Sequence, residues 1–290
     1  MQDYIILTDS TADLPKELVD ELDIQVEPMT YIIDGKEYSD QPLEDDVAIR
    51  DFYRLLREGK QSTTSQVNQL RFEDIFDAIL KQGQDLLYIA FSSALSGTAE
   101  QATHAAEALQ PKYPDRKIIV VDSLCASLGE GMMVYYAANM RKEGKSIDEV
   151  AEFVRSQRLH LCHWFTVDDL NHLKRGGRVS PTAALVGTML GIKPILHVDN
   201  EGRLIPVSKV RGRRKSLDDL VERARQTIID PEQQTVFISH GDCEQDALYI
   251  KQQVMEKIGV KQIYINYIGP VIGSHSGQGT VALFFFGSKR

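Results

Sequence analysis

Residues 85–109, DLLYIAFSSALSGTAEQATHAAEAL, join three kinds of sequence in one short stretch. Residues 85–91 are almost continuously apolar, a pattern typical of a strand that is buried on both faces of a parallel sheet. Residues 92–98 are mostly small and polar, and residues 99–109 are rich in alanine and glutamate, which favour a helix. The stretch therefore predicts a strand, a loop and a helix, the repeating unit of α/β folds.

The same alternation continues on both sides of this stretch. Further strands are predicted at 4–9, 24–33 and 117–122. Residues 72–80 have apolar side chains at helical spacing, which predicts a buried helix face made of Phe72, Ile75, Phe76, Ile79 and Leu80. After a hairpin around DNEG at 199–202, the pattern predicts helices at about 214–228 and up to 258, and strands at 235–240, 262–268 and 280–286. We therefore expect two α/β lobes, with a mainly parallel sheet in residues 1–160 and a mixed sheet in residues 161–290.

Composition excludes several classes of protein. The 290 residues carry a formal net charge of -9, which argues against nucleic-acid binding because phosphate recognition needs a basic face. The chain starts without the basic and apolar segments of a signal peptide, and no apolar run reaches the ~20 residues that span a bilayer. Three widely spaced cysteines suggest neither a disulfide framework nor a zinc site. We therefore expect a cytoplasmic protein without a membrane span or a bound metal.

Two segments far apart in the chain have the composition of anion-binding loops. They are SSALSGT at 92–98 and GPVIGSHSGQGT at 269–280, and both follow strand-like runs. Ser96 or Thr98 can cap the helix after the first loop, whose N-terminal N–H groups and positive dipole end attract a carboxylate or phosphate. Ser93 and Ser96 add hydroxyl donors. The alternative interpretation is simple helix capping, which needs only one hydroxyl.

One further segment and a histidine add polar side chains to the predicted anion-binding loops. STTSQ at 62–66 offers Thr63, Thr64 and Ser65 as donors, although by itself this segment is better explained as a surface loop that caps a helix. His275 lies among glycines, where backbone can approach a ligand closely, and its charge near neutral pH is expected to respond to an anion. The glycine spacing of GSHSGQG differs from the dinucleotide fingerprint and opens no clear strand-to-helix turn, which argues against a nicotinamide cofactor.

Seven motif-like segments follow one another along nearly the whole chain. They are TDSTADLP at 8–15, TTSQ at 63–66, SSALSGT at 92–98, VDSLCASLGEG at 121–131, LKRGGRVS at 173–180, GTMLGIKPIL at 187–196 and GPVIGSHSGQGT at 269–280. In this order they resemble the DegV family of two-domain α/β fatty-acid-binding proteins, which includes the FakB subunits of bacterial fatty acid kinase.

The resemblance implies that one long-chain fatty acid lies in a tunnel between the two lobes and that no cofactor is needed. Carried onto matching positions, it assigns the carboxylate to Thr64, Ser96, the Gly97 amide and His275. Ser65 and Ser93 are expected to lie beside them, which completes the six-residue set.

The resemblance also implies a partner, a separate fatty acid kinase that phosphorylates the presented carboxylate. The chain has no GxxxxGK[ST] loop and no kinase signature, so we expect a carrier without its own ATP site. The basic run KVRGRRKS at 209–216 predicts docking or phosphate steering through Arg211 and Arg213, together with Arg178, unless the run is only a solvated helix start. Transient contact with a membrane surface stays open.

Three alternatives compete with this interpretation. A serine hydrolase might be assembled from Ser96, His275 and Asp122, although ALSGT is not the G-x-S-x-G elbow. A non-lipid anionic metabolite is the second alternative, because the same loops suit it. A metal at LHLCHW, residues 159–164, is disfavoured because side chains three apart on a strand point to opposite faces.

One apolar segment bears on the choice between lipid and metabolite. PTAALVGTMLGIKPIL at 181–196 favours a lipid if Ala184, Leu185, Met189 and Leu190 line a flexible apolar wall, but the same residues also suit an ordinary core.

Overall fold

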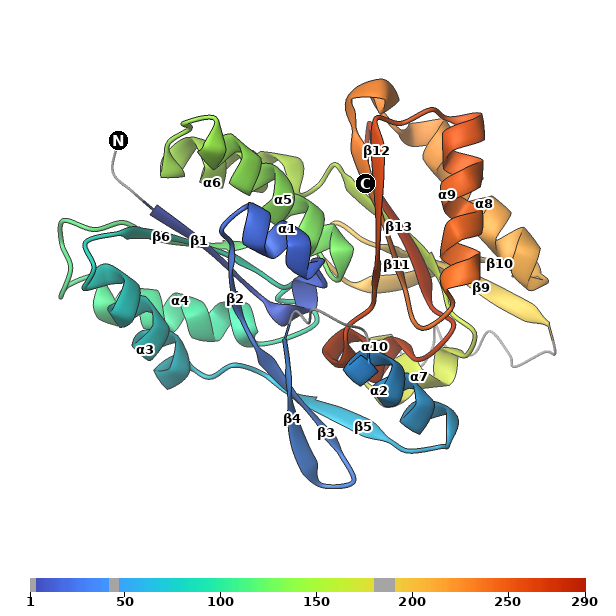
Figure 1. Ribbon diagram of the computed structural model, residues 1–290, viewed down its shortest axis with the longest axis horizontal. Helices are drawn as coiled ribbons and strands as arrows, with labels where there is room; N and C mark the ends of the chain where they lie inside the picture. Colours follow the sequence, from blue (N-terminus) through green and yellow to red (C-terminus); the bar gives the residue numbers. More distant parts are fainter. Residues whose placement is uncertain (1–3, 42–46, 180–190) are drawn as a thin grey trace.

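The computed structural model describes residues 4–41, 47–179 and 191–290 (Figure 1). Within these residues the strands form three sheets, of four, six and three strands. The four-stranded sheet belongs to the N-terminal part of the chain and the six-stranded sheet to the C-terminal part, so the expected two α/β lobes are confirmed. The segment 180–190, which includes Ala184, Leu185, Met189 and Leu190 of the predicted apolar wall, lies outside the described residues.

The N-terminal sheet is parallel throughout, as predicted. In spatial order its strands are β2 (Gln25–Glu27), β1 (Tyr4–Asp9), β6 (Asp85–Ala90) and β7 (Ile118–Asp122). The two central strands, β1 and β6, are buried along their whole length, which explains their unbroken apolar sequence. Short η1 (Ser10–Ala12) follows β1 at its carboxyl end.

Helices cover both faces of this sheet. On one face lie α3 (Gln69–Leu80) and α4 (Thr98–Leu109), and the predicted apolar face of α3 packs into the core with Phe72 and Phe76 fully buried. The other face carries α1 (Lys16–Glu21), α5 (Leu128–Lys142) and α6 (Ile147–Gln157).

A small antiparallel sheet corrects two expectations. It consists of β4 (Lys36–Asp40), β3 (Met29–Ile33) and β5 (Ser62–Ser65), with α2 (Val47–Arg57) between β4 and β5 in the chain. The predicted strand at 24–33 is in fact β2 and β3, which belong to different sheets and are separated by Pro28, a residue without an N–H for the strand ladder. Residues 62–65, interpreted as a loop, form an edge strand because β3 supplies their hydrogen-bond partners.

The C-terminal sheet is mixed, as predicted. Its spatial order is β10 (Leu204–Arg211), β9 (Ile192–Val198), β8 (Leu161–Thr166), β13 (Val281–Phe286), β11 (Thr235–His240) and β12 (Gln262–Tyr267). The predicted hairpin around 199–202 is confirmed by the antiparallel pairing of β9 with β10. The outer face carries α8 (Arg213–Thr227) and α9 (Glu244–Lys257), and η3 (Pro231–Gln233) lies between α8 and β11 in the chain.

Two short helices lie where the lobes meet. They are α7 (Leu170–Arg175) and α10 (Pro270–Ser276), and α10 contacts α7, α2, β3 and β5 (Figure 1).

Successive side chains of β13 point to opposite faces of the C-terminal sheet, and the two faces pack against different parts of the protein. Ala282 and Phe284 face the other lobe, whereas Leu283 and Phe285 pack under α8 and α9.

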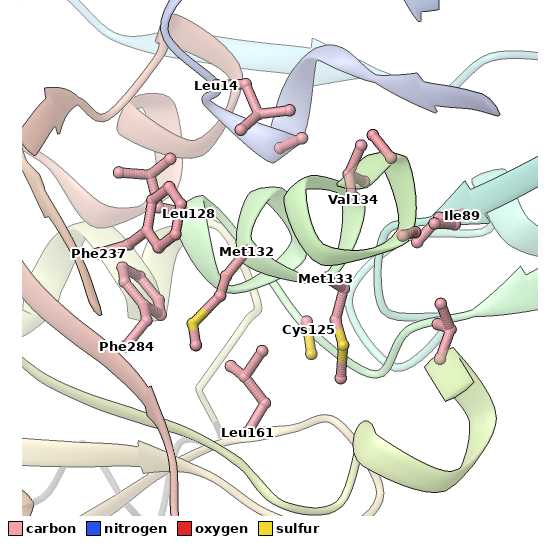
Figure 2. Packing of buried hydrophobic residues seen from close by; sticks show 14 of the residues in the cluster. Leu14, Ile89, Cys125, Leu128, Met132, Met133, Val134, Leu161, Phe237 and Phe284 are labelled. Atoms are coloured by element: carbon pink, nitrogen blue, oxygen red, sulfur yellow. The ribbon is translucent and has the colours of Figure 1, made fainter. Parts of the chain in front are cut away.

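Helix α5 joins the two lobes through one continuous core. Figure 2 shows Leu128, Met132 and Met133 of α5 among side chains of both lobes, including Phe237 and Phe284 of the C-terminal sheet. All five side chains are fully or almost fully buried. The shared core therefore holds the lobes in one arrangement around the space between them.

Among the described residues, no helix combines the length and apolar character needed to cross a bilayer.

Candidate ligand cavity between the lobes

A cavity of about 350 Å³ lies between the lobes, within the size range of small-molecule sites. Most of its wall is apolar. The apolar lining residues are Met29, Phe91, Leu95, Ala126, Phe165, Leu173, Val198, Leu204, Ile268, Val271, Ile272, Ala282 and Phe284. Both lobes contribute to this wall, so the cavity exists only in the assembled fold.

Polar groups gather where three separate segments converge on the cavity. Strand β5 supplies Thr64, the loop before α4 supplies Ser96 and Gly97, and α10 supplies His275 and Ser276. Antiparallel pairing of β5 with β3 places Thr64 opposite Tyr31, and the contact of α10 with β5 brings the histidine to it. The two loop segments predicted to share one site therefore do meet, together with β5. Ser65 also lines the cavity.

Thr64 and His275 form the central polar contact. Thr64 Oγ1 lies 2.8 Å from His275 Nε2, whereas His275 Nδ1 is buried without a hydrogen-bond partner among the described residues. A buried acceptor without a partner costs less than a buried donor without one, so we assign the proton to Nε2. Nε2–H then donates to Thr64, whose own hydroxyl proton is free to donate to an anion.

The His275 side chain is uncharged at neutral pH. Burial, and secondarily the nearby positive charge of Arg178, lower the pKa of His275 to about 4. This value corrects the expectation that the charge of His275 responds to an anion near neutral pH. At neutral pH the ring therefore contacts Thr64 as an uncharged hydrogen-bonding partner. Hydroxyl and amide donors are the groups that can hold an anion beside an uncharged ring.

Helix α4 adds its N-terminus to this polar end. The N-cap position is Gly97, which corrects the assignment of the cap to Ser96 or Thr98. Ser96 Oγ still accepts from the Thr98 N–H at 3.3 Å and lies 2.9 Å from Thr98 Oγ1. The twelve-residue helix therefore points its N-terminal end and Ser96 toward the cavity.

Two predicted site residues do not reach the polar end. Ser93 is exposed and does not line the cavity, because the loop turns so that the Ser93 N–H faces Asp122 Oδ1 at 3.3 Å. Arg213 is no free surface cation. Its guanidinium donates to Asp246 Oδ2 at 2.9 Å and to Gly279 O at 2.7 Å, and lies 3.7 Å from Asp168. Arg211 is exposed at the end of β10.

Arg178 lines the cavity at its polar end. Its Nε donates to Leu95 O at 3.1 Å, and Nη1 donates to Gly176 O, so one side chain bridges the loop before α4 and the turn after α7. Burial lowers the pKa of Arg178 from its ordinary value. The residue therefore supplies a partly desolvated positive charge beside the cavity, in addition to any role in docking.

The run GSHSGQG, residues 273–279, opens no strand-to-helix turn, as predicted, because it ends α10 and leads into β13. The strand-to-helix turn of this segment lies earlier, at Gly269 and Pro270 after β12. The cavity-lining residues His275 and Ser276 lie at the other end of this seven-residue helix. The site thus uses side chains from the helix end, which keeps it distinct from a dinucleotide loop.

Three serines that line the cavity were not predicted as site residues from the sequence. Ser276 Oγ is buried without a hydrogen-bond partner among the described residues, and Ser276 lines the cavity. Ser127 and Ser239 line it from the start of α5 and from β11. Ser276 stood within the quoted GSHSG motif and Ser127 within the quoted VDSLCASLGEG motif. Ser239 lies inside a buried strand, TVFISH, where only its polar character among apolar neighbours marked it.

The geometry disfavours a serine hydrolase. A triad needs an acid on the second ring nitrogen of the histidine, and His275 Nδ1 has no partner in the described residues. Asp122 instead accepts from the backbone N–H groups of Ser93 and Leu124. In the described part of the chain, no group of three or more His, Cys, Asp or Glu side chains is arranged to hold a metal ion.

Comparison with known proteins shows which family the chain matches. A model of the DegV family, described as "Uncharacterised protein, DegV family", matches residues 4–288. A DegV domain-containing protein of Clostridium perfringens is 49% identical over 290 residues, covering 100% of this chain and 99% of the relative.

Solved structures agree with the sequence match. A DegV family protein of Thermus thermophilus, described for its fatty acid binding, is 30% identical and covers 99% of this chain and 100% of its own, with a TM-score of 0.88. DegV of Bacillus subtilis, described as a fatty acid binding protein, is 27% identical with a TM-score of 0.82, covering 98% of this chain and 99% of its own. Because the family model, the relatives and the two-lobed fold agree over almost the full length, this chain belongs to the DegV family.

Proposed function

We propose that this chain binds a single long-chain fatty acid in the cavity between its lobes and presents the carboxylate to a separate fatty acid kinase. The observation that carries the proposal is the cavity itself, with its apolar wall and a polar end where uncharged hydroxyl and amide donors lie beside the Arg178 guanidinium. The fatty acid binding described for the Thermus thermophilus and Bacillus subtilis proteins supports the same ligand here. A non-lipid metabolite is a poorer match to so long an apolar wall.

The energetics suit a carrier. Burying about fifteen methylene groups at ~0.8 kcal/mol each gives a gross stabilisation of roughly 12 kcal/mol before ordering costs are subtracted. The carboxylate at the other end needs donors, because an ion sealed in an apolar cavity without them costs several kcal/mol. Thr64, Ser96, Ser276 and the Gly97 N–H supply them in this proposal, with Ser65 beside them.

Native mass spectrometry of the purified protein, followed by denaturing extraction, tests the ligand. We expect one fatty acid per chain, released on denaturation and identified by its mass. A protein that is empty as purified, and stays empty when offered palmitate and oleate, would contradict the proposal.

Gly176 offers a sharp test of the polar end. A Cβ at Gly176 would collide with His275 Nδ1, so Gly176→Ala is expected to displace the ring from Thr64 and to weaken fatty acid binding about tenfold. The neighbouring Gly177 is the matched control. It has φ of +70° and open space around it, so Gly177→Ala is expected to lower stability through backbone strain while leaving affinity unchanged. Equal affinities in all three proteins, measured by fluorescent fatty acid displacement, would argue against the assignment.

The kinase part of the proposal is supported by a second, outer cavity of about 240 Å³. It shares Thr64, Arg178 and His275 with the lipid cavity and adds the cations Lys60 and Arg175. A phosphoryl donor reaching the carboxylate from this side would meet positive charge in an otherwise acidic protein. The chain itself acts in this proposal as a carrier without its own ATP site.

Substitutions of surface arginines can distinguish presentation of the carboxylate to the kinase from binding of the fatty acid. Arg175, at the outer cavity, and Arg211, on the exposed edge of β10, are both exposed. We expect Arg175→Gln and Arg211→Gln to lower acyl-phosphate formation severalfold with a kinase ATP-binding subunit, because complementary charge speeds association. Fatty acid affinity is expected to stay unchanged. Arg155→Gln, on the exposed side of α6, is the control. An unchanged rate in both test variants would remove docking from this surface.

A further inference from the structure

A second group of polar side chains lines the same cavity away from the carboxylate end. Ser127, at the start of α5, and Ser239, in β11, are 5% and 0% exposed. Ser127 Oγ lies 2.5 Å from Asp13 Oδ2 and 3.0 Å from Ser239 Oγ. The three residues come from three separate segments, and the two serines lie among apolar lining residues such as Ala126 and Ala282.

The register of β13 gives the position of these serines along the cavity. Thr280 lies beside the carboxylate end, because its hydroxyl donates to Ser276 O at 3.0 Å. Two residues further on, Ala282 pairs with Ser239, and at ~3.3 Å per residue this pair lies roughly 7 Å from Thr280. Phe284 lies a further two residues along and also lines the cavity. The serine pair therefore lies midway between Thr280 and Phe284 along the part of the cavity wall that β13 forms.

Counting the hydroxyl and carboxyl protons of Asp13, Ser127 and Ser239 shows that Ser239 keeps a free hydrogen-bonding position whether Asp13 is ionised or protonated. If Asp13 is ionised, Ser127 gives its one hydroxyl proton to that carboxylate, which leaves both the proton and the lone pairs of Ser239 unused. If Asp13 is protonated, it donates to Ser127 and Ser127 donates to Ser239, which leaves the Ser239 proton unused. Burial raises the pKa of Asp13 well above its usual range, which favours the second state.

The backbone at Ser127 is also held in a costly conformation. Ser127 has φ of +54°, a left-handed value that non-glycine residues rarely adopt, and it is the N-cap residue of α5. Its side chain makes no capping hydrogen bond and turns instead to Asp13 and Ser239. The fold thus keeps a serine here and directs its hydroxyl to the polar group instead of the helix.

We propose that the cavity accepts a long-chain fatty acid carrying a hydroxyl group in the middle of its chain, and that Ser239, positioned by Ser127, hydrogen-bonds this hydroxyl. A hydroxyl both donates and accepts, so it satisfies Ser239 in either state of the group, whereas a methylene satisfies neither. The inference rests on the proposed fatty acid binding and adds the class of acyl chain.

Competition binding tests it with stearate and a series of hydroxystearates whose hydroxyl lies in the middle third of the chain. We expect the wild type to bind at least one hydroxystearate about tenfold more tightly than stearate, the effect of one buried hydrogen bond. Ser239→Ala is expected to remove this preference while still binding stearate. Ser208→Ala, on β10 with its hydroxyl bonded to Arg223, should keep it.

The outcomes separate the two proposals. Stearate binding without any preference for a hydroxystearate, or a preference that survives Ser239→Ala, overturns the hydroxyl subsite alone. A wild type that binds neither acid overturns the proposed fatty acid binding. If Ser239→Ala does not fold, Ser239→Cys, whose thiol is a weak donor and acceptor, is measured by the same affinity ratio, and a preference that survives there overturns the subsite.

Discussion

Thr64→Val is expected to lower fatty acid affinity by about 10- to 100-fold, the effect of losing a hydrogen bond to a charged group worth about 1.5–3 kcal/mol. Valine matches threonine in shape but cannot donate to a carboxylate. The same change leaves His275 Nε2–H without its 2.8 Å partner, so the free energy of unfolding of the empty protein should fall by about 1–3 kcal/mol. Titration calorimetry and chemical denaturation measure the two effects separately.

Two controls on the same strand make this test specific. Thr64→Ser keeps the hydroxyl and should retain most of the affinity. Thr63→Val makes the same chemical change at an exposed residue of β5 that lines only the outer cavity, so the affinity should not change. If Thr64→Val binds as tightly as Thr64→Ser, the carboxylate does not lie at this hydroxyl.

Asp40→Asn is expected to make the protein more stable at pH 8 than the wild type. Asp40 is 6% exposed, and burial is the main cause that raises its pKa to about 7. In the unfolded chain the same carboxyl has the ordinary aspartate pKa of about 3.8. Between these values the folded state binds more protons than the unfolded state, so the stability contributed by protonated Asp40 is complete below 3.8 and is lost as pH rises through about 7.

The size of this loss follows from the shift of about three pKa units, which corresponds to roughly 4 kcal/mol. Asparagine keeps the side-chain oxygen that accepts from the Val271 N–H at 3.1 Å, but it cannot ionise. Denaturation curves from pH 4 to pH 8 should therefore show a stability difference, variant minus wild type, that grows with pH. Asp74→Asn, on the exposed side of α3, should give a flat difference curve. A flat curve for Asp40→Asn would show that the carboxyl ionises freely in the folded protein.

The location of Asp40 links this stability to the site. The Val271 N–H that it accepts from belongs to the first turn of α10, and the neighbouring Asp13 accepts from the Gly269 N–H at 2.9 Å. These two carboxyls therefore attach the start of α10 to the N-terminal lobe. His275 lies four residues after Val271 in the same helix, so the approach of its ring to Thr64 depends on this attachment.

The sequence by itself determined the alternation of strands and helices, the parallel and mixed sheets, and the segments that carry the site. These features depend on local periodicity, since an apolar run such as residues 85–91 or a helical stripe such as Phe72 and Phe76 is written in neighbouring residues. The family resemblance is of the same kind, because short motifs keep their order along the chain. Thr64, Ser96, Gly97 and His275 were therefore all expected at the site.

Only the tertiary structure decided which polar groups meet. The strand at residues 62–65 has no apolar pattern and exists because β3 pairs with it, and Ser93 turns to Asp122 while Ser276 enters the cavity. The neutral state of His275 follows from burial between lobes that are distant in sequence. Pairing, burial and desolvation are non-local, because each depends on atoms brought together by the whole fold, and no pattern of neighbouring residues contains them.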